Sequence, residues 1–125
     1  MNVTGPLKTL IAANAPAHAL MSGRVYPGVL EQETSYPAAA INVVSTAPTN
    51  SKTTASSLDR VLIQLDVYAT TYATTAGAAA AIRTALDYKT SGSLTHIEFN
   101  GQEDMFSVKP ELHRIMQTYS IGYKP

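Results

Sequence analysis

The clearest alternation of apolar and polar residues covers residues 58–69 of this 125-residue chain. Val61, Ile63, Leu65 and Val67 fall on one side of the segment. The other side is mixed, with Arg60, Leu62, Gln64, Asp66 and Tyr68. A period of two residues is that of a β-strand with one buried face. The segment is therefore predicted to be a strand whose aliphatic side packs on the core.

Other segments rich in β-branched and aromatic residues lack helical spacing. They predict strands at 38–47, 94–100 and 112–123, with short extended pieces at 24–26 and 105–108. Residues 31–37 and 101–104 are predicted to be loops. Ten polar residues, 48–57, separate the first two long strands. Hairpin loops usually have two to five residues, so we expect an antiparallel hairpin with an extended polar tip.

Apolar residues recur at spacings of three and four in two places. The first predicts a helix from residue 5 to about Asn14, where Pro16 interrupts it and leaves a short turn over 16–21. The second predicts a helix over 72–88, with Thr70 or Thr71 as its N-cap. The expected buried face of this helix is Ala78, Ala79, Ile82, Ala85 and Leu86.

Gly77 lies inside the second predicted helix, within a run of alanines. Glycine in a helix interior costs about 1 kcal/mol relative to alanine. We expect close packing against the sheet to compensate. The order helix, strand, strand, helix, strand, strand predicts one α+β domain over residues 1–125. Its sheet is expected to be mostly antiparallel with about four strands, with two main helices packed on one face and a long polar hairpin tip.

The charge balance indicates which classes of partner the chain can bind. Nine basic residues oppose nine acidic ones, and only 14% of the chain is charged. A dedicated DNA-binding domain normally has a basic surplus, so that class is disfavoured. Apolar residues make up 45% of the chain, enough for a core and too many for disorder of the whole chain. The scarcity of charge indicates a surface that partners cover.

Candidate chemistry is sparse. Cysteine is absent, which excludes disulfides and thiol nucleophiles, and the three histidines, His18, His96 and His113, lack metal-ligand spacing. No cofactor or metal site is expected. The longest weakly polar stretch, 67–82, is too short and too rich in threonine to span a bilayer. The chain is therefore expected to be a soluble protein of the cytosol.

No nucleophile elbow, phosphate loop or local Ser/His/Asp cluster occurs in the sequence. Glu31 and Glu33 form a possible carboxylate pair, but a solvated loop is the favoured interpretation. His96 as a general base and His113–Arg114 as a nucleic-acid contact are weaker than structural roles for the same residues. The sequence therefore predicts no catalytic residue and no enzyme.

Asp66 lies mid-strand on the mixed face, which the pattern places outside the core. That face either contacts solvent or meets another subunit. Seven tyrosines against two phenylalanines favour surfaces that partners bury. Expected assembly contacts are Lys52 and Thr53 in the polar tip, and Asp66 and Tyr68 on the strand. The tip is expected to become ordered against a neighbour.

Several stretches, in order, resemble the tail terminator, or tail completion, proteins of long-tailed bacteriophages. The resembling pieces are 21–28 (MSGRVYPG), 35–38 (SYPA), 65–69 (LDVYA), 72–76 (YATTA), 82–86 (IRTAL) and 119–121 (YSI). Each is weak alone, and it is their series along nearly the whole chain that carries the resemblance. The family has no catalytic signature, so no active-site residue is carried over.

The resemblance implies a structural virion protein. Such proteins form a ring, commonly a hexamer, on the head-proximal end of the tail tube, after assembly in the host cytoplasm. The ring ends tube polymerisation and meets the head-closure or connector protein, and DNA passes through its lumen without sequence-specific binding. No membrane is implied. The alternatives are another head-tail connector or tail component, or a small α+β ligand-binding module.

Overall fold

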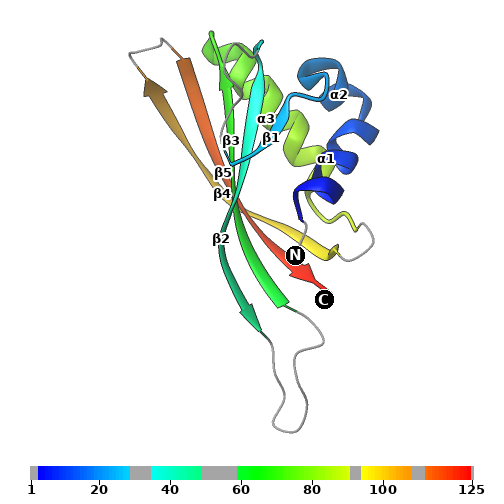
Figure 1. Cartoon of the computed structure of the whole chain (residues 1–125). Helices are drawn as coiled ribbons and strands as arrows, with labels where there is room; N and C mark the ends of the chain where they lie inside the picture. Colours follow the sequence, from blue (N-terminus) through cyan, green and yellow to red (C-terminus); the bar gives the residue numbers. More distant parts are fainter. Residues whose placement is uncertain (1–2, 29–34, 49–58, 91–93, 108–111, 125) are drawn as a thin grey trace, which may run out of the picture.

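In the part of the chain that the structure describes, a five-stranded sheet carries three helices on one face (Figure 1). The computed structural model describes residues 3–28, 35–48, 59–90, 94–107 and 112–124. In chain order the elements are α1 (Thr4–Ala13), α2 (Ala15–Met21), β1 (Val25–Pro27), β2 (Ala38–Pro48), β3 (Asp59–Ala69), α3 (Tyr72–Leu86), β4 (Leu94–Ser107) and β5 (Leu112–Tyr123). The α+β class predicted from the sequence is confirmed.

The strand order is β1-β2-β3-β5-β4, and every neighbouring pair is antiparallel except β1 and β2, which are parallel. Among the described residues the sheet is therefore mixed and has five strands, where the sequence predicted about four. The additional strand is β1, which pairs with Ala39, Ala40 and Ile41 of β2. Its three residues are too few to show a periodicity, so the sequence indicated only an extended piece.

Arg24 explains why the chain between α2 and β1 folds as it does. Its Nε donates a hydrogen bond to the Pro37 carbonyl (2.9 Å), and its Nη2 donates to the Leu20 carbonyl (3.1 Å). One side chain thereby joins the end of α2 to the start of β2. This contact gives a structural reason for the arginine in the Gly-Arg-Val-Tyr stretch.

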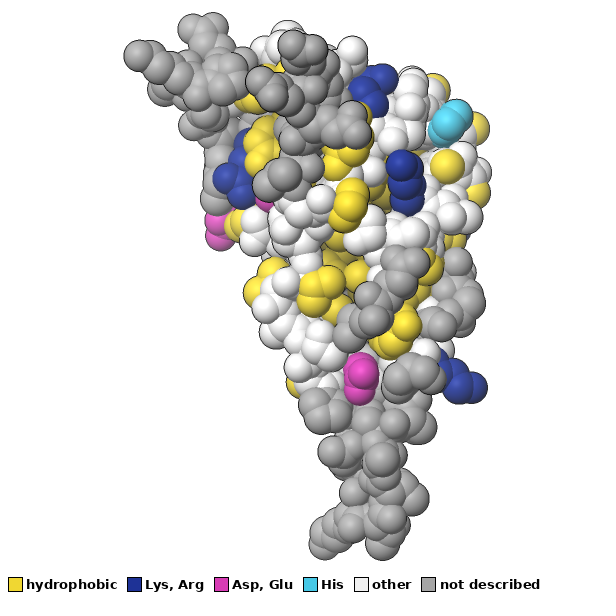
Figure 2. All heavy atoms as spheres, in the orientation of Figure 1, with side chains coloured by type: hydrophobic (Ala, Val, Ile, Leu, Met, Phe, Trp, Pro, Cys, Tyr) yellow, Lys and Arg dark blue, Asp and Glu magenta, His cyan; other side chains and the backbone are white. Residues whose placement is uncertain are grey.

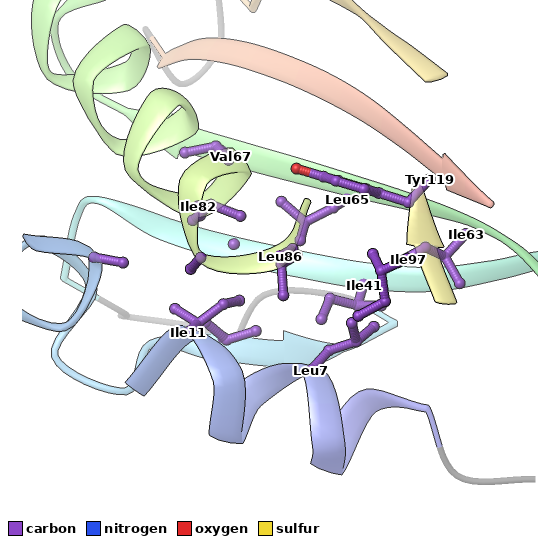
Figure 3. Packing of buried hydrophobic residues seen from close by; sticks show 14 of the residues in the cluster. Leu7, Ile11, Ile41, Ile63, Leu65, Val67, Ile82, Leu86, Ile97 and Tyr119 are labelled. Carbon is purple, nitrogen blue, oxygen red and sulfur yellow. The ribbon is translucent and has the colours of Figure 1, made fainter. Parts of the chain in front are cut away.

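The core lies between the helices and one face of the sheet (Figure 3). The predicted aliphatic side of β3 is buried there, since Val61, Ile63, Leu65 and Val67 are each 0% exposed. From the helices come Leu7 and Ile11 of α1 and Ile82 and Leu86 of α3. The prediction that β3 is buried beneath the helix carrying Ile82 and Leu86 is confirmed.

The N-terminal helical region breaks where proline predicted it. Asn14 separates α1 from α2, and its side chain accepts a hydrogen bond from the Ala17 N–H (3.1 Å). Pro16 sits in the first turn of α2, where its missing N–H leaves no bond unmade. The second piece is a helix of seven residues and not the short turn that was predicted. The N-cap Asn14 and the first-turn Pro16 therefore start a second helix where the first one ends.

Strand β4 corrects another prediction. The sequence indicated a strand over 94–100, a loop over 101–104 and a short strand after it, whereas β4 runs from Leu94 to Ser107 without interruption. Its pairing with β5 shifts register between Phe99 and Gly101. The polar run after Gly101 resembles a loop by composition, but its exposed side chains belong to an edge strand. A bulge at that point absorbs the irregularity.

Helix α3 begins as predicted, because the Thr71 hydroxyl accepts a hydrogen bond from the Thr74 N–H (3.3 Å). It ends at Leu86, two residues earlier than predicted. The C-cap Asp87 is extended, with ψ 127°, and Tyr88 after it has a left-handed φ of 60°, so neither residue continues the helix. The predicted buried face is confirmed, with Thr75 in addition to Ala78, Ala79, Ile82, Ala85 and Leu86.

The close packing predicted for Gly77 is not found. It lies on the exposed side of α3, and a Cβ added there would meet no atom within 4 Å. Close packing against the sheet therefore does not offset its helix cost in the subunit. We expect Gly77→Ala to stabilise the isolated subunit by about 0.5–1 kcal/mol, the usual difference between these residues in a helix. Urea unfolding of both proteins measures this difference, and an unchanged or lower midpoint would contradict it.

A polar network is buried between α3 and the sheet. The Gln117 side chain, 0% exposed, donates from Nε2 to the Ala79 carbonyl (2.9 Å) and to Gln102 Oε1 (3.3 Å). The Tyr119 hydroxyl donates to Gln117 Oε1 (2.8 Å). Because a buried polar group is costly without a partner, these bonds favour one position of α3 along the sheet.

Burial raises the pKa of Tyr119, and the negative charge of Asp87 adds to the effect. Above pH 10 the unfolded chain releases this phenolic proton while the folded chain keeps it. Stability should therefore fall by about 1.4 kcal/mol per pH unit for this group, a loss absent below pH 10. Tyr119→Phe should cost about 1–3 kcal/mol at pH 8, because Gln117 loses a partner, yet lose stability less steeply above pH 10. Denaturant unfolding from pH 8 to pH 11 tests both, and parallel curves for the two proteins would refute the assignment.

Two predicted regions lie outside the residues that the structure describes. The loop carrying Glu31 and Glu33 is one of them. The other is the polar tip with Lys52 and Thr53, apart from Pro48, which is the last residue of β2. The expectations for these residues stay predictions.

Candidate assembly surface

Asp66 and Tyr68 lie on the face of the sheet opposite the helices, as the alternation along β3 predicted. Register places Asp66 beside Ala40 of β2 and Met116 of β5, and Tyr68 beside Arg114 of β5. We call this the helix-free face. It carries polar and small side chains together with Leu62, Tyr68 and Met116, and it is the surface on which the sequence placed two of its assembly contacts.

Asp66 is buried on this face, at 3% exposure, although no helix covers it. Its Oδ1 accepts a hydrogen bond from Arg114 Nε (3.2 Å) and forms an ion pair with Arg114 Nη2 (3.1 Å), and its Oδ2 accepts a hydrogen bond from Gln64 Nε2 (3.1 Å). A paired and hydrogen-bonded carboxylate can be held out of water. Asp66 itself is therefore not exposed to solvent, because the chain supplies both its partner and its cover. Whether the face around it contacts solvent or another subunit stays a prediction.

The Arg114 side chain contacts both Asp66 and Tyr68. Its guanidinium carbon lies 5.7 Å from the centre of the Tyr68 ring, and 30% of its side chain stays exposed. Burial raises the pKa of Tyr68, with a further rise from the Asp66 charge and an opposing effect of Arg114. Tyr68 is consequently neutral at physiological pH. It offers a partner an aromatic ring and a hydroxyl beside an arginine.

Arg114 is the residue whose partner the sequence did not identify. The sequence favours a structural role for His113 and Arg114 over a nucleic-acid contact, and the Arg114 guanidinium does hold a carboxylate 48 positions away in the chain. The one indication in the sequence was Asp66 in the middle of a predicted strand, because a carboxylate held out of water needs a partner. Nothing in the sequence specified which strand would bring it.

The three histidines considered as candidate site residues lie on separate elements. His18 is exposed on α2. His96 lies 3.4 Å from Glu98 Oε2 on β4, beside a shallow hollow of about 410 Å³ that Asp59 and Arg60 also line. The His113 ring meets the edge of Tyr72 at 6.0 Å. Over the described residues, no group of three or more His, Asp or Glu side chains could hold a metal ion.

Nearly the whole chain matches a known protein family. The family model for tail completion protein gp17 matches residues 6–124. The chain belongs to this family. This tail completion protein is thus a structural protein of a phage tail, the class that the sequence resemblance indicated. No curated protein matches it.

One similar solved structure is a chain from the virion of a native gene transfer agent particle. The tail completion protein matches it with a TM-score of 0.76 and 21% sequence identity, over 98% of this chain and 95% of that one. At this identity the likeness shows that the two chains share a fold. The five-stranded sheet with its helices is therefore not peculiar to this sequence.

The surface of the tail completion protein is poor in charge. On the face that Figure 2 shows, the lysines, arginines and acidic residues are few, and most of the surface consists of uncharged side chains and backbone. No helix in the described part of the chain is long and apolar enough to cross a membrane. Large hydrophobic residues are exposed at Tyr36, Val43, Val44, Tyr72 and Tyr88. An uncharged surface with separate apolar residues costs little to bury against other proteins.

Proposed function

We propose that this tail completion protein forms a ring of identical subunits, six in number, on the head-proximal end of the tail tube. The ring ends addition of tube protein and joins the tail to the head-closure or connector protein. DNA passes through its lumen without sequence-specific contacts. The match of the tail completion family to residues 6–124 carries this proposal.

The physical properties of the subunit support an assembly role. Equal numbers of acidic and basic residues give no net attraction to DNA that would hinder its passage. The two edges of the sheet, one formed by β1 and the part of β2 beyond it and the other by β4, differ in length and charge. Contacts between unlike surfaces are head-to-tail, and they close into a ring when the rotation divides a full turn.

The proposed assembly contacts are Asp66 and Tyr68 on the helix-free face, with Lys52 and Thr53 of the polar tip. Since the chain itself buries Asp66, a neighbour would meet Tyr68 and the exposed part of Arg114. Tyr68→Ala is expected to weaken ring formation. Tyr88→Ala is the matched control, because Tyr88 is 77% exposed and lies after the end of α3, outside β3 and β5.

Electron microscopy of tail tubes assembled with and without the protein tests the function. We expect tubes of uniform length with a ring at one end when the protein is present, and overlong tubes without it. Tubes of uniform length in its absence, with heads that fail to attach, would favour a head-closure role. Incorporation along the whole tube would favour a tube protein. Either result would overturn the terminator assignment.

A further inference from the structure

The outer edge of β2 is unprotected in the described part of the chain. β1 pairs only with Ala39–Ile41, and beyond them no described strand lies against β2 on that side. The strands β2 and β3 continue past the helices, as Figure 1 shows at the lower end of the sheet. A strand edge with unpaired N–H and C=O groups readily accepts another strand.

The side chains of this edge do not discourage pairing. Residues 42–47 contain no charge. Val43 is 48% exposed and Val44 is 54% exposed, and Val44 is the residue that the β2 bulge leaves out of the pairing with β3. Proteins that keep a strand edge solvent-exposed usually place lysine or other charges on it. This edge has the composition of a strand that is covered after assembly.

The opposite edge of the sheet is different. β4 exposes Glu98, Glu103 and Asp104, and its pairing with β5 has two register shifts. Two β4 edges would bring acidic side chains together, which destabilises strand pairing. The uncharged β2 edge imposes no such repulsion on β4.

Strand direction also matches. β2 and β5 are both antiparallel to β3, and β4 is antiparallel to β5, so β2 and β4 run in opposite directions within one subunit. If the strands run along the axis of a ring, rotation to the next subunit preserves these directions. The β4 edge of one subunit would then meet the β2 edge of the next as an antiparallel pair, the arrangement with directly opposed hydrogen bonds.

We infer that residues 42–47 of β2 pair with the outer edge of β4 from a second copy of this chain, joining the sheets around the ring. The inference rests on the proposed ring, and it adds which edges meet and in which direction. The exposed Val43 and Val44 are covered by this contact, and the helices stay on one side of the continuous sheet.

Thr46 allows the edge to be blocked without disturbing the subunit. The Ala39 N–H donates to Arg24 and the Ile41 carbonyl accepts from Gly28, so both point away from β3. The bulge shifts this alternation by one residue, which turns the Thr46 N–H outward. Thr46→Pro removes the outward donor and keeps the bonds to β3. Thr46→Ala retains the N–H and is the matched control.

We expect Thr46→Pro and Thr46→Ala to share a thermal midpoint. Rings should be lost only in the proline variant, as measured by native mass spectrometry of the protein alone or by electron microscopy of tail tubes. Rings that persist with proline would overturn the edge pairing and leave the ring proposal intact. A wild-type protein that stays monomeric, alone and on tail tubes, would overturn the ring and the pairing with it.

Engineered cysteines decide the matter if the proline variant does not fold. The chain has no cysteine of its own. Ala47, Glu98 and Glu103 are exposed on the helix-free face, one on β2 and two on β4. Ala47→Cys protein should be mixed with Glu98→Cys or Glu103→Cys protein under oxidation. We expect disulfide-linked dimers in which β2 of one chain is joined to β4 of the other. Dimers of Ala47→Cys with itself alone would indicate a two-fold β2 contact and overturn the inference.

Discussion

Leu65→Ala should lower the free energy of unfolding by about 2–5 kcal/mol, because it empties a site in the centre of the core. Leu65 is 0% exposed and lies between the sheet and α3, near Leu86 (Figure 3). Small domains are stable by only about 5–15 kcal/mol, so this loss is a large part of the total. Chemical denaturation with a common slope for both proteins measures it.

Leu62→Ala is the matched control for that measurement. It removes the same atoms from the same strand, but Leu62 is half-buried on the helix-free face and lies outside the core cluster. We expect it to cost less than half as much as Leu65→Ala. If the two variants were equally destabilised, the helix-free face would contribute as much apolar burial as the core face, contrary to the assignment of the faces.

The faces of β3 could be predicted because their cause is local. A period of two places alternate residues on opposite sides whatever the strand's neighbours are. The same holds for α3, where helical spacing identified Ile82 and Leu86 as buried and Thr71 as the cap. These features depend on residues within one element, so the sequence of that element contains the information.

The sheet edges could not be predicted in this way. β1 is a strand only because Arg24 ties its start to Pro37 and because Ala39 is there to pair with it. β4 continues through Gly101 and the polar residues after it because β5 pairs with them. Both outcomes depend on contacts between segments distant in the chain. Local composition indicated a loop in one case and a short extended piece in the other.

The candidate assembly surface was also predictable only where its cause is local. Alternation placed Asp66 and Tyr68 correctly on the face away from the helices. Their environment depends on Arg114, which β5 brings across from another part of the chain. Gly77 shows the converse, since its cost to the helix could be predicted but the absence of any packing partner within the subunit could not. The family resemblance covered what neither local rule could supply, namely the class of the protein.

Arg114→Met should destabilise the subunit by about 3–5 kcal/mol, the cost of leaving a buried carboxylate without its cation. Asp66 would keep only the Gln64 amide as a partner, and at 3% exposure it has little access to water. Methionine retains most of the apolar stem of arginine over Tyr68, so lost packing contributes little. Thermal and urea unfolding at pH 7 measure the effect.

The reverse change should cost less. Asp66→Asn preserves shape and the Gln64 contact, and the cation it leaves behind, Arg114, has 30% of its side chain in solvent. We expect a loss of about 1–2 kcal/mol, typical of a hydrogen bond to a charged group. The double variant should be more stable than Arg114→Met alone, because it no longer contains a buried unpaired charge. Additive losses across this cycle would show that Asp66 and Arg114 act independently, and that the buried carboxylate does not depend on the arginine.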